Sequence, residues 1–184
     1  VKLLYCQPYY FKHYQVENGL SNNAVICSMQ DKKGFMWFGT RDGLNRFDGY
    51  SFKVFHSDPD NPNGLGSNLV RSLFVDETGY IWVGTDAGVS RFDGKYFRNF
   101  SIDDGLPDNQ ILQIKEDKNG RIWFLSFSGM LSYFHNGKIY NKSNSPLLRK
   151  LNITEIIISF FEDSRGRFWL GTNKNLLYLF DGER

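Results

Sequence analysis

This 184-residue chain contains three kinds of side chain that could do chemistry: one segment rich in oxygen ligands, three histidines and two cysteines. The segment 58–64 (DPDNPNG) brings carboxylate and amide oxygens close together, and these are the ligands that Ca²⁺ prefers. Its two prolines and the missing distal glutamate depart from the EF-hand pattern. We therefore expect a rigid, solvated loop over 58–64 and no metal site.

Groups suited to catalysis are present but not arranged for it. The three histidines show no metal-ligand spacing, and neither a Gly-x-Ser-x-Gly motif nor a Cys/His pair at catalytic spacing occurs: His13, His56 and His135. Cys6 and Cys27 could form one disulfide bridge, although a buried thiol is the simpler expectation for Cys27. The sequence predicts no catalytic residue and no cofactor.

Acidic residues recur instead at one repeated position. Four aspartates are each followed three residues later by a turn glycine and six residues later by tryptophan: Asp31, Asp76, Asp117 and Asp163, with Trp37, Trp82, Trp123 and Trp169. The tryptophans are 45, 41 and 46 residues apart. A period of this length with aromatic and glycine signatures indicates β-propeller blades. We expect each aspartate to cap a turn and each tryptophan to pack between blades rather than to bind a sugar.

The predicted fold is all-β, a β-propeller of about four blades, each of four antiparallel strands, a to d. The blades are expected at residues 23–55, 68–100, 109–140 and 155–182, within a propeller region of residues 10–184. Strand a reads as a buried run and should line the central axis. An asparagine begins it in three copies, and Glu155 stands at that place in the fourth: Asn23, Asn68 and Asn109.

The two ends of the repeat are offset. Residues 10–15 alternate around aromatics and align with a strand d, so the chain is expected to begin with the last strand of a preceding blade. Residues 1–9 form a lead-in that could be a remnant of a signal peptide, although Lys2 breaks its apolar run. The repeats would form a closed four-bladed ring, part of a longer array, or half of an eight-bladed ring made by two copies.

Strand direction alternates, so the d–a and b–c connections share one face of the propeller. Both long insertions fall there, between Phe55 and Asn68 and between Tyr140 and Glu155, whereas the a–b and c–d turns are short and uniform. Variable loops on a rigid scaffold are where binding sites gather. We expect ligand contacts from the b–c tips, by Arg41, Asp42, Asp86, Phe127, Asn173 and Lys174. Phe127, which breaks the repeat, would stack on a sugar or pack against the insertion beside it.

Bulk properties exclude some partners. Twenty-two basic and 20 acidic residues give a net charge of +2, which provides no electrostatic case for nucleic acid or an anionic membrane. No stretch approaches the roughly 18 apolar residues of a membrane span.

The repeat Asp-x-x-Gly-x-(Ile/Met/Phe)-Trp-(Phe/Val/Leu)-Gly-Thr-x-x-Gly-(Leu/Val)-x-Arg-Phe-Asp-Gly, preceded by Gly-Leu-x-x-Asn, resembles the two-component regulator propeller repeat. The resemblance covers residues 10 to 182 and implies the periplasmic sensor of a hybrid two-component histidine kinase of gut Bacteroidetes. It implies ligand sensing, with an oligosaccharide or glycan as the ligand and with catalysis elsewhere in the parent chain.

The same resemblance implies a membrane tether only through the parent chain. Further blades of that chain, or a second copy, would then be partners of this segment. Two other readings stay open. Propellers also host lyases, glycosidases and quinoprotein dehydrogenases, and others serve only as protein–protein scaffolds.

Overall fold

The computed structural model describes residues 10–181, so the expected lead-in 1–9 and Cys6 lie outside the described residues. The first sheet contains β1 (Val25–Gln30), β2 (Met36–Thr40), β3 (Gly43–Phe47) and β4 (Phe52–Phe55), and the second contains β5 (Val70–Val75), β6 (Ile81–Thr85), β7 (Gly88–Phe92) and β8 (Phe97–Phe100). The third contains β9 (Ile111–Glu116), β10 (Ile122–Ser126), β11 (Leu131–His135) and β12 (Lys138–Tyr140), and the fourth β13 (Ile157–Glu162), β14 (Phe168–Thr172) and β15 (Leu177–Phe180). Every sheet is an antiparallel meander.

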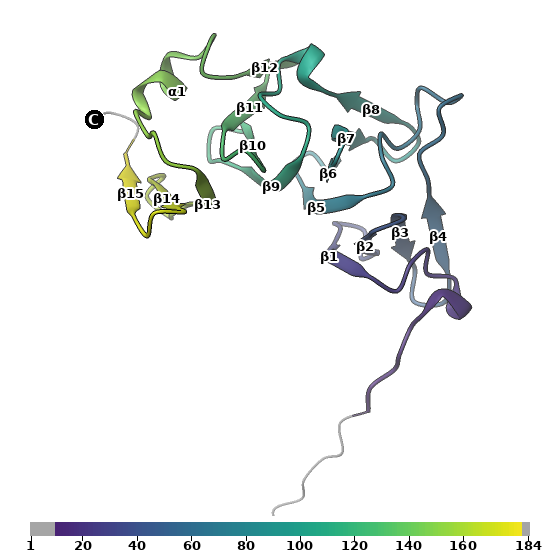
Figure 1. Ribbon diagram of the computed structural model, residues 1–184. Helices are drawn as coiled ribbons and strands as arrows, with labels where there is room; N and C mark the ends of the chain where they lie inside the picture. The colour runs from purple at the N-terminus through teal and green to yellow at the C-terminus, as the bar shows by residue number, and fades with distance from the viewer. Residues whose placement is uncertain (1–9, 182–184) are drawn as a thin grey trace, which may run out of the picture.

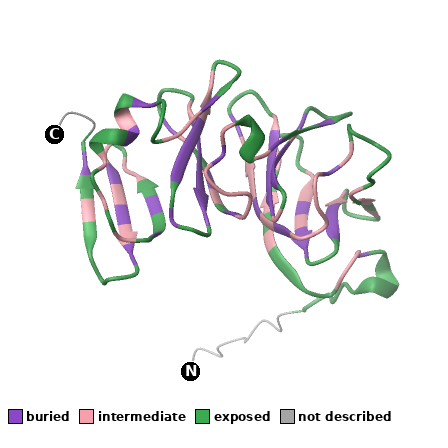
Figure 2. Cartoon of the chain, turned by 45° about the horizontal axis from the view of Figure 1, so that its top comes forward, coloured by how far each residue is buried: buried purple, intermediate pink, exposed green. Residues whose placement is uncertain are grey.

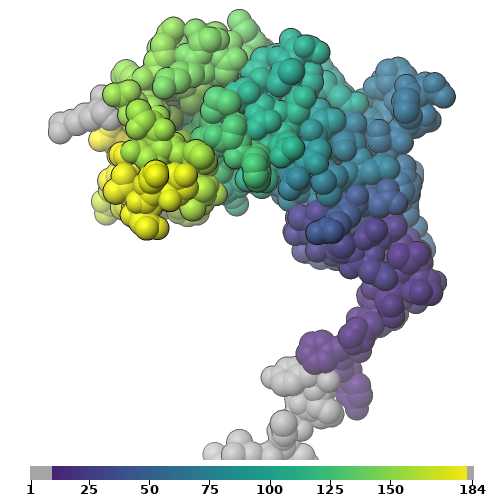
Figure 3. Space-filling model, viewed as in Figure 1, coloured from purple at the N-terminus to yellow at the C-terminus, as the bar shows by residue number. Residues whose placement is uncertain are grey.

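The four sheets stand side by side as the blades of a propeller (Figure 1). Strands β1, β5, β9 and β13 lie on the inner, concave side, and β4, β8 and β12 lie outside. The all-β propeller class is therefore confirmed. The blades form an open arc, and the first and fourth do not meet (Figure 3). The chain alone thus does not make the four-bladed ring.

The same hydrogen bond recurs in the a–b hairpin of every blade, and it joins the two repeated residues. The indole N–H donates to the aspartate Oδ2 at 2.8, 2.7, 2.8 and 3.0 Å in the pairs Trp37–Asp31, Trp82–Asp76, Trp123–Asp117 and Trp169–Asp163. The same aspartates accept backbone N–H groups of their own turn through Oδ1, as Asp31 does from Lys33 and Phe35. The repeated spacing of six residues is thus the reach of a turn cap across an a–b hairpin.

The tryptophans pack between neighbouring blades. Trp37, Trp82 and Trp123 are each 1% exposed. Each approaches an aromatic ring of the next blade, with centroid separations of 5.8 Å to Phe92, 5.1 Å to Phe134 and 4.8 Å to Phe168, respectively. Burial is concentrated between sheets, whereas the strand nearest the C-terminus is largely exposed (Figure 2).

Carboxylates add a second tie on the a–b turn side. Glu116 Oε2 accepts the N–H of Glu77 at 2.7 Å, and Glu162 Oε2 accepts that of Lys118 at 3.0 Å. In each case the last residue of an inner strand holds the turn of the preceding blade. Partial burial raises the pKa of both glutamates.

The expected first strand over residues 10–15 is wrong. These residues are not in a strand, and the 3₁₀ turn η1 (Val16–Asn18) follows them. A strand d needs the strand c of its own blade as an antiparallel partner, and no blade precedes β1 among the described residues. Tyr14 instead lies edge-on to Phe47 and Phe52 of the first blade, at 5.0 and 5.7 Å.

Candidate ligand-binding face

The d–a connections and the b–c turns meet on one side of the arc, which we call the loop face. Backbone hydrogen bonds join the b–c turns of the first, third and fourth blades to d–a connections: Arg41 N to Ala24 O, Gly43 N to Asn68 O, Phe127 N to Gln110 O and Asn173 N to Ile156 O. Because Gly43 of the first blade bonds to the loop that enters the second, one of these bonds also links two blades. Hydrogen bonds therefore hold most of the turns and loops of the loop face in place.

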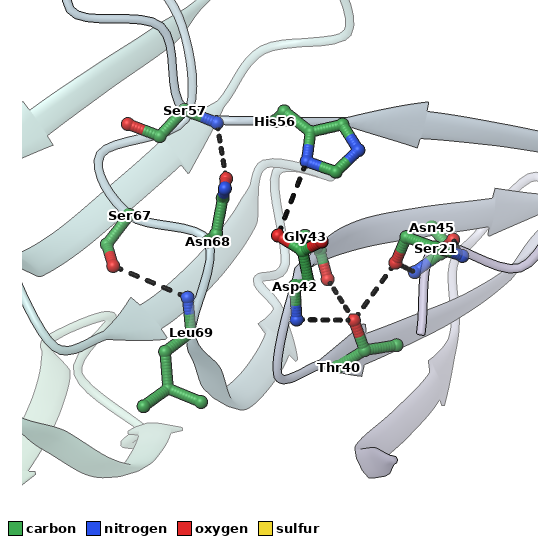
Figure 4. A network of polar contacts seen from close by, with 10 residues as sticks. All are labelled: Ser21, Thr40, Asp42, Gly43, Asn45, His56, Ser57, Ser67, Asn68 and Leu69. Carbon is green, nitrogen blue, oxygen red and sulfur yellow. Dashed lines mark hydrogen bonds and ion pairs between the residues drawn. The ribbon is translucent and has the colours of Figure 1, made fainter. Parts of the chain in front are cut away.

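The first blade shows how its turns are held (Figure 4). Thr40 Oγ1 accepts the N–H of Asp42 at 3.0 Å, donates to Gly43 O at 3.0 Å, and lies 2.9 Å from Ser21 Oγ. Asn45 accepts the N–H of Ser21 at 2.8 Å. Buried side chains thus fix the d–a loop and the b–c turn together, and the tip residues are left to face outward.

The residues expected to bind ligand all lie on these b–c tips, but not in one cluster. The side chains of Arg41, Asn173 and Lys174 are exposed. Asp42 Oδ1 lies 3.8 Å from His56 Nδ1, and Asp86 forms an ion pair with Arg71 of β5. They come from three separate turns, and Phe127 occupies a fourth.

Phe127 is 63% exposed. Of its two expected roles, packing against the neighbouring insertion would bury the ring. The turn that carries it is fixed, because Ser128 N donates to Asp108 Oδ2 at 3.1 Å and Gly129 N donates to Ser126 O at 2.9 Å. A rigid turn therefore presents a large apolar ring to solvent.

Glu155 departs from a structural role that its counterparts perform. Asn23, Asn68 and Asn109 each accept, at 2.9, 2.7 and 3.0 Å, a backbone N–H from the residue two positions after strand d or its equivalent. Glu155 instead accepts the hydroxyl of Tyr178 at 3.0 Å. Hydrogen bonds from its own backbone N–H and from Tyr178 lower the pKa of this carboxyl group. The fourth blade thus carries an ionised carboxylate where the others carry a loop cap.

A pocket of about 240 Å³ opens beside Glu155. Its walls are the b–c turn of the third blade and the connection 141–156 that enters the fourth blade. Its polar side chains are Ser128, Lys142, Thr154 and Glu155, and its apolar ones are Pro107, Met130, Leu131, Leu148, Leu151, Ile153, Ile156 and Ile157. No sequence pattern placed these residues together, because half of them lie in the connection 141–156, which is longer than the connections into the first and third blades.

The insertion includes a short helix, α1 (Pro146–Lys150), which the sequence interpretation missed. Ser145 caps it by accepting the N–H of Leu148 at 3.2 Å, and its hydroxyl lies 3.1 Å from that of Tyr133. A serine followed by proline is a helix-start signal that could have found it. Leu148 is 4% exposed and joins the apolar cluster around Trp123.

The third and fourth blades are spaced by larger side chains than the other pairs. Gly39 and Gly84 pair with the small residues Cys27 and Ser72 on the inner strand, whereas Leu125 pairs with Gln113. Gln113 bridges to the fourth blade with its amide, donating to Phe160 O at 2.8 Å and accepting Phe160 N at 3.2 Å. The insertion and its pocket lie beside the space between these two blades.

The oxygen-rich segment 58–64 folds as turns. Asp58 Oδ1 accepts the N–H of Asp60 at 3.0 Å, and Asn61 Oδ1 accepts that of Asn63 at 3.1 Å. Asn63 O in turn accepts the N–H of Phe97 on β8 at 2.9 Å. Within residues 10–181, no three His, Cys, Asp or Glu side chains are grouped as metal ligands would be.

Cys27 lies half-buried on β1, facing Gly39. Burial raises the pKa of its thiol to about 11. The thiol is therefore protonated at neutral pH, which agrees with a packing role and not with a nucleophile. In the part of the chain that the structure describes, no helix is long and apolar enough to cross a membrane.

Blade order, the Asp–Trp tie and the loop face define the chain as a set of β-propeller blades. The two component regulator propeller family matches residues 19–42, 64–87, 105–128 and 150–174, one match for each blade. The chain belongs to this family.

Two relatives are similar to this chain, the first in structure and sequence and the second in sequence over a short segment. The extracellular domain of the hybrid two component system BT3049 from B. thetaiotaomicron superposes with a TM-score of 0.79 and 26% identity, over 96% of this chain and 26% of that one. Histidine kinase P4 of Formosa agariphila is 49% identical over 51 residues, 28% of this chain and 4% of that protein. The chain thus spans only a small part of either relative.

A more distant structure shares the fold alone. The WD40 propeller domain of Doa1 gives a TM-score of 0.63 at 18% identity, covering 89% of this chain and 53% of that one.

Proposed function

We propose that this chain is the ligand-sensing part of an extracytoplasmic propeller in a hybrid two-component histidine kinase, and that its ligand is an oligosaccharide or glycan. Family membership and the similarity to the extracellular domain of a hybrid two component system support the sensor role. Such a domain lies outside the cytoplasm, in the periplasm, and the kinase chemistry belongs to the parent protein. Further blades of that longer chain are the proposed structural partners.

The exposed ring of Phe127 on a rigid turn is the observation that carries the ligand class. Sugars offer an apolar C–H face and a rim of hydroxyl groups, so they bind where an exposed aromatic stands among polar side chains. The loop face supplies such polar side chains at its other tips, including Arg41, Asp42 and Lys174. We assign Asp86, ion-paired with Arg71, and Asn173 to the outer part of the same surface.

The test is to measure binding of the purified chain to a panel of oligosaccharides by calorimetry and by thermal shift. Phe127→Ala should weaken the binding of a recognised oligosaccharide by about tenfold, because a stacked ring is lost. The matched control is Tyr50→Ala, since Tyr50 is 96% exposed but lies on a c–d turn of the opposite side. Equal affinity of both variants and the parent chain would remove Phe127 from the site, and the absence of any glycan binding would contradict the function.

A further inference from the structure

The pocket beside Glu155 differs in kind from the rest of the loop face. The other tips project polar side chains from short turns, whereas this pocket is lined mostly by apolar side chains, with Lys142 and Glu155 as its charged groups. Leu148 and Ile157, which are 4% and 7% exposed, anchor these walls in the protein interior. The pocket is therefore a preformed feature of the third and fourth blades.

Its size limits what it can hold. A volume of about 240 Å³ is below the roughly 300–1,000 Å³ typical of sites for drug-sized ligands. One six-membered ring with its substituents is a suitable occupant, and a longer oligomer would have to extend outward along the loop face. The apolar walls, including Met130 and Ile153, suit the C–H face of such a ring.

Its charges limit the ligand further. Glu155 supplies one carboxylate and Lys142 one ammonium group, so the side chains that line the pocket carry no net charge. A carboxylate accepts hydrogen bonds only, at about four lone-pair sites, and therefore pairs with hydroxyl donors. Ser128 and Thr154 can both donate and accept. The lining thus matches a ring that carries several hydroxyl groups and no charge of its own.

We propose that this pocket is the subsite for a single uncharged sugar unit, and that Glu155 is its specificity-determining residue, which binds the sugar hydroxyl groups. The inference rests on the proposed glycan-binding function and adds to it a place and a chemical class. The position supports it independently, because the equivalent residue of every other blade is an asparagine engaged in capping a loop.

The experiment compares neutral trisaccharides, such as maltotriose, mannotriose and xylotriose, with trigalacturonate by calorimetry. The parent chain should bind at least one neutral sugar and should bind trigalacturonate about tenfold more weakly, because Glu155 repels its carboxylates. Glu155→Gln should lower the affinity for the neutral sugar by about tenfold, since a charge-assisted acceptor is lost.

The same substitution should raise the affinity for trigalacturonate, because Lys142 is then left without an opposing charge. A variant that merely unfolds cannot produce this opposite change. Glu17→Gln is the matched control, because Glu17 is an exposed glutamate at the far end of the arc and should leave both affinities unchanged.

The outcomes separate the two proposals. No binding of any glycan by the parent chain overturns the proposed function, and the subsite with it. Glycan binding that Glu155→Gln does not alter overturns the subsite only. Trigalacturonate binding as tight as that of the neutral sugars overturns the uncharged class.

Discussion

Equivalent residues on strand c show how a single substitution changes the hydrogen bonding of a blade. Asn45 accepts the N–H of Ser21 at 2.8 Å, and Ser90 Oγ accepts that of Gly66 at 3.1 Å. Ser132 occupies the same position in the third blade and is 0% exposed, but its hydroxyl has no hydrogen-bond partner among the described residues. The residue that would donate to it is Pro107, which has no N–H.

We predict that removing the hydroxyl group destabilises the chain at Ser90 but not at Ser132. Ser90→Ala leaves the N–H of Gly66 without its acceptor and should lower the free energy of unfolding by about 1–3 kcal/mol. Ser132→Ala removes an unpaired buried hydroxyl and should change that free energy little or raise it. Urea unfolding of both variants, followed by circular dichroism, makes the comparison. A similar loss for both variants would mean that the Ser132 hydroxyl does form a hydrogen bond in the folded chain.

At the scale of the strands, one residue position sets the spacing between blades. A Cβ atom built on Gly84 would lie 2.8 Å from Ile111 O and 3.0 Å from Ile111 Cγ2 of the next blade, and closer still to Ser72 Oγ. A Cβ atom on Gly171 would meet only Ser159 Oγ, at 2.7 Å, the end of a side chain that can rotate. The glycine of the Gly-Thr motif therefore permits close approach of the next blade, and Leu125 shows the spacing that results without it.

Alanine at these two glycines should separate the two effects. Gly84→Ala pushes against the backbone of β9 and should destabilise the chain by about 1–3 kcal/mol, as overpacking does. Gly171→Ala should change the free energy of unfolding by only a few tenths of the change caused by Gly84→Ala, because no described residue of a further blade covers Gly171. Thermal unfolding of the two variants gives the measurement. If Gly171→Ala were as damaging as Gly84→Ala, strain within the blade rather than blade spacing would explain the conservation of glycine between the first, second and fourth repeats.

The elements that could be predicted from sequence are those that the repeat specifies. Asp76 and Trp82 at fixed spacing predict a hairpin, and four copies predict four blades. The hydrogen bond between the two residues was not predicted, because a turn cap explained the aspartate and packing between blades explained the tryptophan. Residues 10–15 were misassigned because a strand pattern says nothing about whether its partner is present. The pocket could not be predicted, since Glu155 meets Met130 only through the path of the 141–156 insertion.

In the whole molecule, the two ends of the arc differ. Each end exposes one half of the blade–blade interface that is buried between neighbouring blades inside the arc. Leu44, Val89 and Leu131 are 0%, 1% and 7% exposed beneath the next blade, whereas their counterpart Leu177 is 67% exposed. Phe161 and Leu179, on the same face of the fourth sheet, are 59% and 48% exposed. At the other end, an apolar pocket is lined by Tyr14, Leu20, Val25, Met36, Phe38, Phe47 and Phe52.

These two ends should associate when the chain is isolated, because the first blade of one copy presents the kind of surface that covers a following face inside the arc. We predict concentration-dependent self-association in sedimentation velocity, and a shift toward monomer for Leu177→Glu, which places a charge in the apolar face. Lys174→Glu, a change to glutamate at an exposed loop tip of the same blade, should leave the association unchanged. A parent chain that stays monomeric at all concentrations would contradict the prediction, and so would association that Leu177→Glu leaves intact. Either result would mean that the exposed apolar side chains of the fourth sheet do not drive association.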